Sequence, residues 1–106
     1  LIKYNKLVKH IVMLGLKDGA EGMTKKQIAE KMKEQLNSLR PIIKEIRSLE
    51  VGVNFLESPA AYDVVLYTEF DSRDDLQTYQ VHPDHVALKD FILSVTEKRA
   101  VVDYEI

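Results

Sequence analysis

The seven residues from Tyr79 to His85 hold the side chains best suited to chemistry in this chain. They read Tyr-Gln-Val-His-Pro-Asp-His, so a phenol and two of the three histidines lie within one short stretch. An imidazole titrates near neutral pH and acts as an acid or a base, and a nearby tyrosine hydroxyl donates or accepts a hydrogen bond. We therefore expect any acid–base chemistry of this chain to take place here.

The same stretch also has a purely structural explanation. Pro83 suits the first position of a helix, and a residue directly before proline is pushed out of helical geometry. His82 would then mark a helix boundary, while Tyr79 and His85 pack with their polar ends satisfied locally. The structural and the chemical interpretation both remain open at the level of sequence.

The spacing of the histidines allows a third interpretation, a metal-binding site. His82 and His85 form a His-x-x-His pair, and His10, Asp84 or Asp103 could supply a third ligand. Zinc sites usually show more ligands at tighter spacing, so we expect no bound metal. The chain also lacks a glycine-rich phosphate loop and a Gly-x-Ser-x-Gly motif, so we expect no organic cofactor.

Length and composition narrow the class of protein. The 106 residues, 45% hydrophobic and 30% charged, predict a single globular domain over residues 1–106, with residues 1–6 as an extra N-terminal segment. A balance of 15 basic and 17 acidic residues argues against nucleic-acid binding. No apolar run is long enough to span a membrane. The absence of cysteine fits a reducing compartment, so we expect a cytoplasmic location.

Hydrophobic periodicity predicts four strands and several helices. Thr24 and Gln27 have the spacing of a capping box that starts the first helix. Asp71 or Ser72 should cap a short second helix, and Pro83 should begin another. The predicted strands are Leu7–Leu16, Leu49–Phe55, Tyr62–Phe70 and Ala100–Ile106, and the helix after Pro83 is expected to run through Val95.

This order of elements is the split βαβ plan of the ferredoxin-like fold, an α+β protomer with a four-stranded antiparallel sheet and helices on one face. The first strand is apolar on both sides, with His10 and Val12 on one face and Ile11 and Met13 on the other. An apolar sheet face that no helix covers usually marks an interaction site. We therefore expect a homodimer formed through that face, with Val12 a residue to test if it lies there.

Several segments together resemble one known family. They are Val8–Val12, Ser48–Asn54, Tyr62–Leu66, Tyr79–Val86 and Val102–Tyr104, and they are similar in register to the stress-responsive dimeric α+β barrel (Dabb) domains. The resemblance spans nearly all of the chain, and its most specific part is the Tyr79–Val86 block. It implies a ferredoxin-like protomer and a homodimer that forms a dimeric α+β barrel.

The resemblance also implies site residues. Most members of this family have no assigned biochemical role, but polyketide cyclases among them resemble this chain. Their catalytic tyrosine and histidine match Tyr79 and His85, and a further pocket histidine matches His10. Two functions follow. We favour a protein that binds a small apolar or carbonyl ligand in a dimer-barrel pocket, with His10 and His82 as ligand contacts. The alternative is a cofactor-independent cyclase or lyase-like enzyme with His85 as base and Tyr79 as hydrogen-bond partner.

Overall fold

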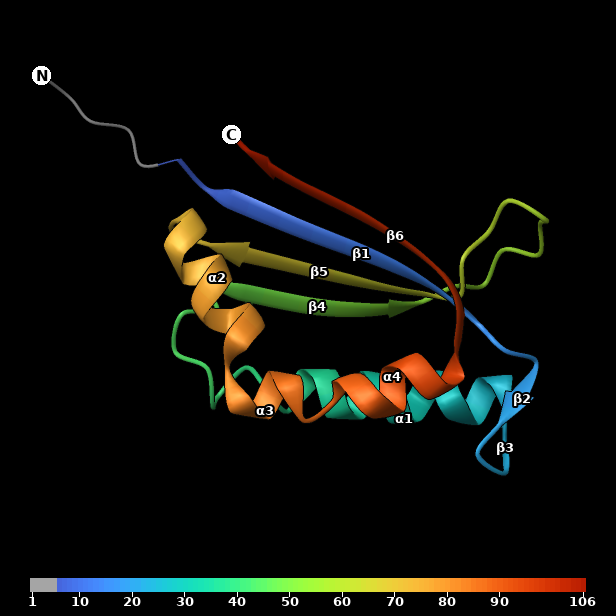
Figure 1. Ribbon diagram of the computed structural model, residues 1–106. Helices are drawn as coiled ribbons and strands as arrows, with labels where there is room; N and C mark the ends of the chain where they lie inside the picture. The colour runs from blue at the N-terminus through green and yellow to red at the C-terminus, as the bar shows by residue number, and fades with distance from the viewer. Residues whose placement is uncertain (1–5) are drawn as a thin grey trace, which may run out of the picture.

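The computed structural model describes residues 6–106 and contains a four-stranded sheet with helices along one side (Figure 1). Its strands follow the order β4-β5-β1-β6, and each neighbouring pair is antiparallel. Their bounds are β1 (Val8–Leu16), β4 (Ser48–Val53), β5 (Val64–Phe70) and β6 (Thr96–Glu105). The predicted ferredoxin-like α+β architecture is confirmed. Apart from Lys6, the predicted segment 1–6 lies outside the described residues.

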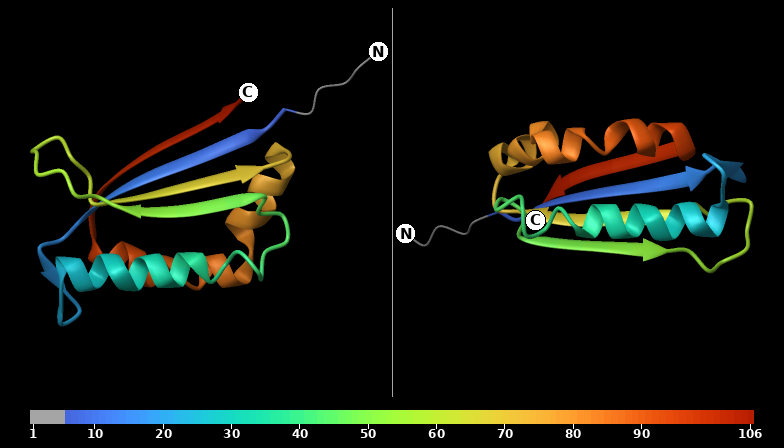
Figure 2. Two further views of the ribbon diagram at one scale, coloured as in Figure 1. Left: turned by 180° about the vertical axis from the view of Figure 1, so that it is seen from behind. Right: turned by 90° about the horizontal axis from the view of Figure 1, so that it is seen from below.

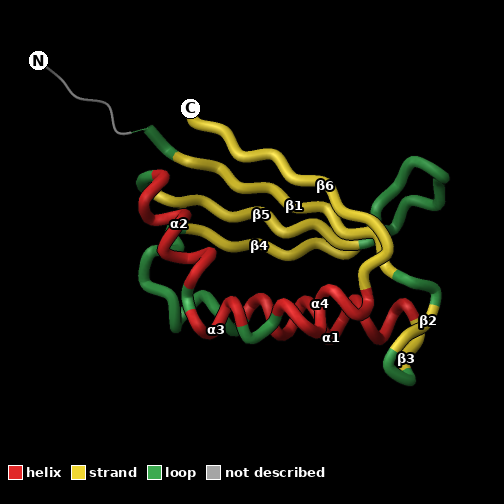
Figure 3. The backbone as a smooth tube through the Cα atoms, in the orientation of Figure 1, coloured by secondary structure: helices red, strands yellow, loops and turns green. Residues whose placement is uncertain are grey.

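The helices cover only one face of the sheet, as the two further views show (Figure 2). They are α1 (Lys25–Asn37), α2 (Arg73–Val81), α3 (Pro83–Val86) and α4 (Lys89–Val95). A small hairpin, β2 (Gly19–Ala20) with β3 (Met23–Thr24), precedes α1 and was not predicted (Figure 3). None of the helices among residues 6–106 is long and apolar enough to cross a membrane.

Local side-chain contacts fix where the helices begin. The Thr24 hydroxyl accepts from the Gln27 N–H, and the Gln27 side chain accepts from the Thr24 N–H, so the predicted capping box is confirmed. Ser72 caps α2 by accepting from the Asp75 N–H at 3.0 Å. These contacts satisfy N–H groups that have no partner within a helix. The two caps therefore fix the residues at which α1 and α2 begin.

The two faces of the sheet differ in burial. On the helix side, Val8, Leu14 and Leu66 are buried. On the other side, Met13 and Val65 lie exposed next to each other across β1 and β5. The prediction that one sheet face is apolar yet uncovered by helices is therefore confirmed. Val12 does not lie on it, because its side chain faces the helices and is only 6% exposed.

The second strand is shorter than predicted. It ends at Val53, and the Asn54 side chain then bonds the backbone of Leu56 in both directions, accepting from its N–H and donating to its carbonyl. Such a local bond competes with strand pairing. Phe55 consequently leaves the sheet and is 96% exposed. Tyr62 lies in the same loop, and the third strand begins only at Val64.

The helix predicted from Pro83 to Val95 is divided in two. The Leu88 N–H bonds the carbonyl of His85, three residues back instead of four, and this tighter turn separates α3 from α4. The last helix ends where the Thr96 hydroxyl donates to the Ile92 carbonyl at 2.6 Å. Strand β6 follows at once, so it begins four residues before the predicted Ala100.

Candidate functional site

The sheet and the helices enclose a cavity of about 330 Å³. Its walls come from the helix-facing sides of β1, β5 and β6, from α1, and from the chain that runs from the end of α2 through α4. Apolar atoms make up most of its surface, although half of the lining residues are polar, among them two histidines and two cations. The lining residues are His10, Val12, Leu14, Leu36, Leu66, Gln80, His85, Lys89, Ile92, Leu93, Thr96 and Arg99.

His10 enters this cavity from the central strand and is held by a carboxylate. It is 4% exposed, and its Nδ1 bonds Asp103 on the neighbouring strand β6. The register places the two residues directly opposite each other. A carboxylate can only accept, so Nδ1 carries the proton. In the neutral ring Nε2 is then the acceptor, as in other histidines oriented by a carboxylate.

His85 lines the same cavity from the helix side. Its Nδ1 donates to the carbonyl of Gln80 at 3.1 Å, which again makes Nε2 the acceptor of the neutral ring. Burial lowers the pKa of His85 below its ordinary value of 6.5, and the charges of Lys89, His10 and Arg99 lower it further, against an opposing contribution from the Gln80 carbonyl. A neutral imidazole at neutral pH is the form that can accept a proton.

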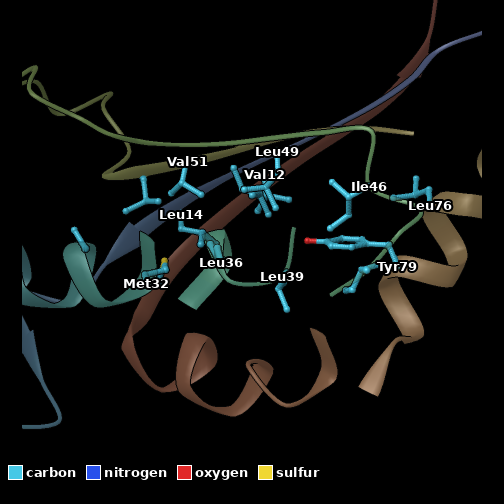
Figure 4. Packing of buried hydrophobic residues seen from close by; sticks show 14 of the residues in the cluster. Val12, Leu14, Met32, Leu36, Leu39, Ile46, Leu49, Val51, Leu76 and Tyr79 are labelled. Carbon is cyan, nitrogen blue, oxygen red and sulfur yellow. The ribbon is translucent and has the colours of Figure 1, made fainter. Parts of the chain in front are cut away.

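Tyr79 lies behind these two rings and not on the cavity surface. Its ring centroid is 4.4 Å from that of His85 and 6.2 Å from that of His10. Figure 4 shows its side chain extending from α2 into the core near Ile46. The hydroxyl is buried without a hydrogen-bond partner among the described residues, and burial raises the pKa of Tyr79 to about 12. The phenol is therefore neutral and close to both imidazoles.

His82 occupies a different place. Its ring caps α3 by accepting from the Asp84 N–H at 3.1 Å, which is the helix boundary that the sequence suggested. It is not among the residues that line the cavity. His82 and His85 thus bond different partners, and residues 6–106 contain no group of three or more potential ligands that could hold a metal ion. The structure brings together Tyr79, His85 and His10 but leaves His82 apart.

Three contributors to the site were not found from sequence. Asp103 was considered only as a metal ligand, and Lys89 and Arg99 were not considered at all. Pairing the last strand with the first would have revealed Asp103, because that register sets it opposite His10. Counting along the same strand in twos places Arg99 on the same face. No comparable signal exists for Lys89, since its position depends on the break between α3 and α4.

Comparison with known proteins identifies the family. The model of the Stress responsive A/B Barrel Domain matches residues 8–106. The chain belongs to this Dabb family. The match covers all the residues of the cavity, so the predicted resemblance is confirmed over the whole described fold.

Individual relatives differ in length and in the function that their names state. Olivetolic acid cyclase from Cannabis sativa is 29% identical over 99 residues, covering 92% of this chain and 94% of the cyclase. A stress-response A/B barrel domain-containing protein from Arabidopsis thaliana is 29% identical over 101 residues, or 94% of this chain, but these span only 37% of that longer protein. A dimeric ferredoxin-like protein of unknown function from Bacteroides fragilis is 38% identical and superposes with a TM-score of 0.82, covering 94% of this chain and 96% of that one.

The buried hydroxyl of Tyr79 leads to a prediction on stability. An unsatisfied buried polar group costs about 1–3 kcal/mol, so Tyr79→Phe should raise the free energy of unfolding by roughly 1 kcal/mol. Urea denaturation at pH 7.5 measures this change. The comparison variant is Tyr67→Phe, which removes a hydroxyl that donates to Glu69 and should therefore lower the free energy of unfolding. A clear loss of stability in Tyr79→Phe would show that its hydroxyl is hydrogen-bonded.

The lowered pKa of His85 predicts how stability depends on pH. Between the ordinary value of 6.5 and the lower folded value, the unfolded chain takes up a proton that the folded protein resists. The free energy of unfolding should therefore decrease as the pH falls below about 6.5. His85→Asn should show a smaller decrease than the parent protein in urea denaturation at pH 7.5 and 5.5. Equal decreases in both proteins would contradict the assignment.

Proposed function

We propose that this Dabb protein is a homodimer that binds a small, largely apolar carbonyl compound in the cavity beside His10 and His85. The observation that carries the proposal is the cavity itself, about 330 Å³ in volume, which sets two imidazoles into the wall of an apolar space. Binding sites for small molecules have this character, with apolar walls and a few polar groups that fix orientation.

The apolar walls favour a hydrophobic body. The sheet supplies three apolar side chains, α1 one and α4 two, which are Val12, Leu14, Leu66, Leu36, Ile92 and Leu93. Moving apolar surface out of water stabilises a complex by about 25 cal/mol per Å². This contribution depends on area and not on direction, so it supports affinity for a compact apolar group without selecting a particular compound.

The polar groups favour a carbonyl with an acidic hydrogen nearby. The Nε2 atoms of His10 and His85 can accept from an enol or hydroxyl group, while the cations Lys89 and Arg99 can donate to a carbonyl oxygen. A β-keto compound carries both features in one molecule. This match between donors and acceptors is the reason for proposing carbonyl compounds over plain hydrocarbons.

Binding can be tested with a panel of small β-keto compounds and simple ketones. We expect chemical-shift changes in ¹H–¹⁵N spectra at residues around the cavity, and His85→Ala should weaken binding of the β-keto ligands by roughly 5- to 30-fold through loss of one hydrogen bond. His82→Ala is the matched control, because that ring lies outside the cavity lining. A loss of affinity in His82→Ala equal to that in His85→Ala would return His82 to the site, and no binding by any compound would refute the proposal.

A cofactor-independent cyclase or lyase-like activity is the second candidate. It is favoured by the neutral state of His85 at neutral pH and by the contact between its ring and Tyr79. In such a reaction His85 would remove a proton next to the carbonyl, and Tyr79, which is not part of the lining, would act by holding the His85 ring in place. The same panel decides this point, since a catalyst consumes its ligand and loses turnover in His85→Ala, whereas a binding protein returns it unchanged.

The uncovered sheet face supports the homodimer. Ile11, Met13, Val65 and Val102 form an apolar region there, and an apolar surface of this kind usually marks an interface. A polar cluster of Lys9, Tyr67 and Glu69 lies on the same face. The related Bacteroides fragilis protein is described as dimeric. A second copy of this chain is therefore the partner that we propose for this face.

The dimer can be tested by placing a charge on the uncovered face. Sedimentation equilibrium at micromolar concentration should give a mass near twice 12.2 kDa. Met13→Asp and Val65→Asp should each shift the protein toward the monomer, because an unpaired charge buried in an interface costs several kcal/mol. Val81→Asp, on an exposed residue of α2, is the control and should leave the dimer intact. A dimer that survives both sheet substitutions would show that another surface is used.

A further inference from the structure

The charges around the cavity all have one sign. Histidines aside, Lys89 and Arg99 are the only charged residues that line it within residues 6–106, and no aspartate or glutamate of that range contributes to the lining. Lys89 comes from α4 and Arg99 from β6, so the two cations approach the same space from different walls. Both are exposed, which places them at the rim and not in the apolar interior.

Neither cation forms an ion pair that would stabilise the described part of the protomer. Among residues 6–106, none of the ion pairs includes Lys89 or Arg99, whereas Lys25 lies 3.5 Å from Asp18 and 3.7 Å from Asp63. Lys89 is also the first residue of α4, where a positive charge is unfavourable with respect to the helix dipole. Their positions therefore do not follow from the stability of the protomer.

The field of these two cations reaches the site. Lys89 and Arg99 both contribute to lowering the pKa of His85. The Asp103 carboxylate accepts a hydrogen bond from His10 but does not itself line the cavity. Because no aspartate or glutamate of the described residues belongs to the cavity wall, a bound anion would meet the two positive charges there directly.

We propose that the compounds bound in this cavity are small apolar carboxylates, with the carboxylate at the rim between Lys89 and Arg99 and the apolar part against Leu14, Leu66 and Ile92. This assignment rests on the proposed binding function and defines its ligand class. An arginine binds a carboxylate through two parallel hydrogen bonds, and a lysine adds a compact charge. A β-keto acid would satisfy both this requirement and the imidazoles.

Matched pairs of ligands isolate the contribution of charge. Hexanoate, octanoate and 3-phenylpropanoate are each compared with the corresponding primary amide by calorimetry at pH 7.5. We expect each carboxylate to bind about 10-fold more tightly than its amide, because a charge-assisted hydrogen bond is stronger than a neutral one. Raising the salt concentration should weaken only the carboxylates, since salt screens exposed charges.

Variants assign the effect to the two cations. Arg99→Gln and Lys89→Gln should each reduce carboxylate affinity by roughly 3- to 10-fold and amide affinity by less, because the glutamine side chain can still donate to a carbonyl oxygen. Lys44→Gln, on an exposed loop residue away from the cavity, is the matched control and should change neither. Equal affinity for acid and amide in the parent protein would overturn the anionic assignment while the binding function stands. Failure of both the acids and the amides, together with the β-keto panel, would overturn the binding function and this assignment with it.

Discussion

Strand β1 is apolar on both of its faces, and the rest of the structure depends on that constraint. Its helix-side residues Val8, Val12 and Leu14 need a cover of helices, which α1, α2 and α4 supply together. Residues Ile11 and Met13 on the other side need a different cover, and none of the helices within residues 6–106 provides one. One strand thus makes the core of the protomer and also leaves an apolar surface that the proposed dimer would cover. Removing this apolar surface from water stabilises folding on one face and would stabilise the proposed dimer on the other.

The same strand carries the one histidine that the core must accommodate. His10 lies between Val8 and Val12 on the buried face, where an unpaired polar group would cost several kcal/mol. Asp103 on β6 removes much of that cost by accepting from Nδ1. Asp103 is itself partly exposed, so this carboxylate keeps some contact with water and is less costly to bury. Pairing across the β1–β6 ladder thus allows a polar group in an apolar wall.

On the helix side of the cavity the polar groups have weaker hydrogen-bond partners. His85 has only a backbone carbonyl as partner, and burial disfavours its charged form. Tyr79, behind it, has a buried hydroxyl without a partner among the described residues. Polar groups left incompletely satisfied reduce stability, and in proteins they occur most often at functional sites. The cavity wall therefore contains His10, whose imidazole has a carboxylate partner, and His85, whose imidazole bonds a backbone carbonyl and packs against Tyr79.

Sequence by itself determined the features that depend on near neighbours. Alternating strands, the capping box at Thr24 and the helix boundary at His82 all follow from contacts within a few residues, and the spacing of Tyr79 and His85 across that boundary brings their rings together. Only the tertiary structure decided which residues complete the site. Asp103 reaches His10 through strand register, and Lys89 and Arg99 face one cavity because two distant elements pack together. Such contacts join residues far apart in the chain, and their geometry is set by the packing of the whole core.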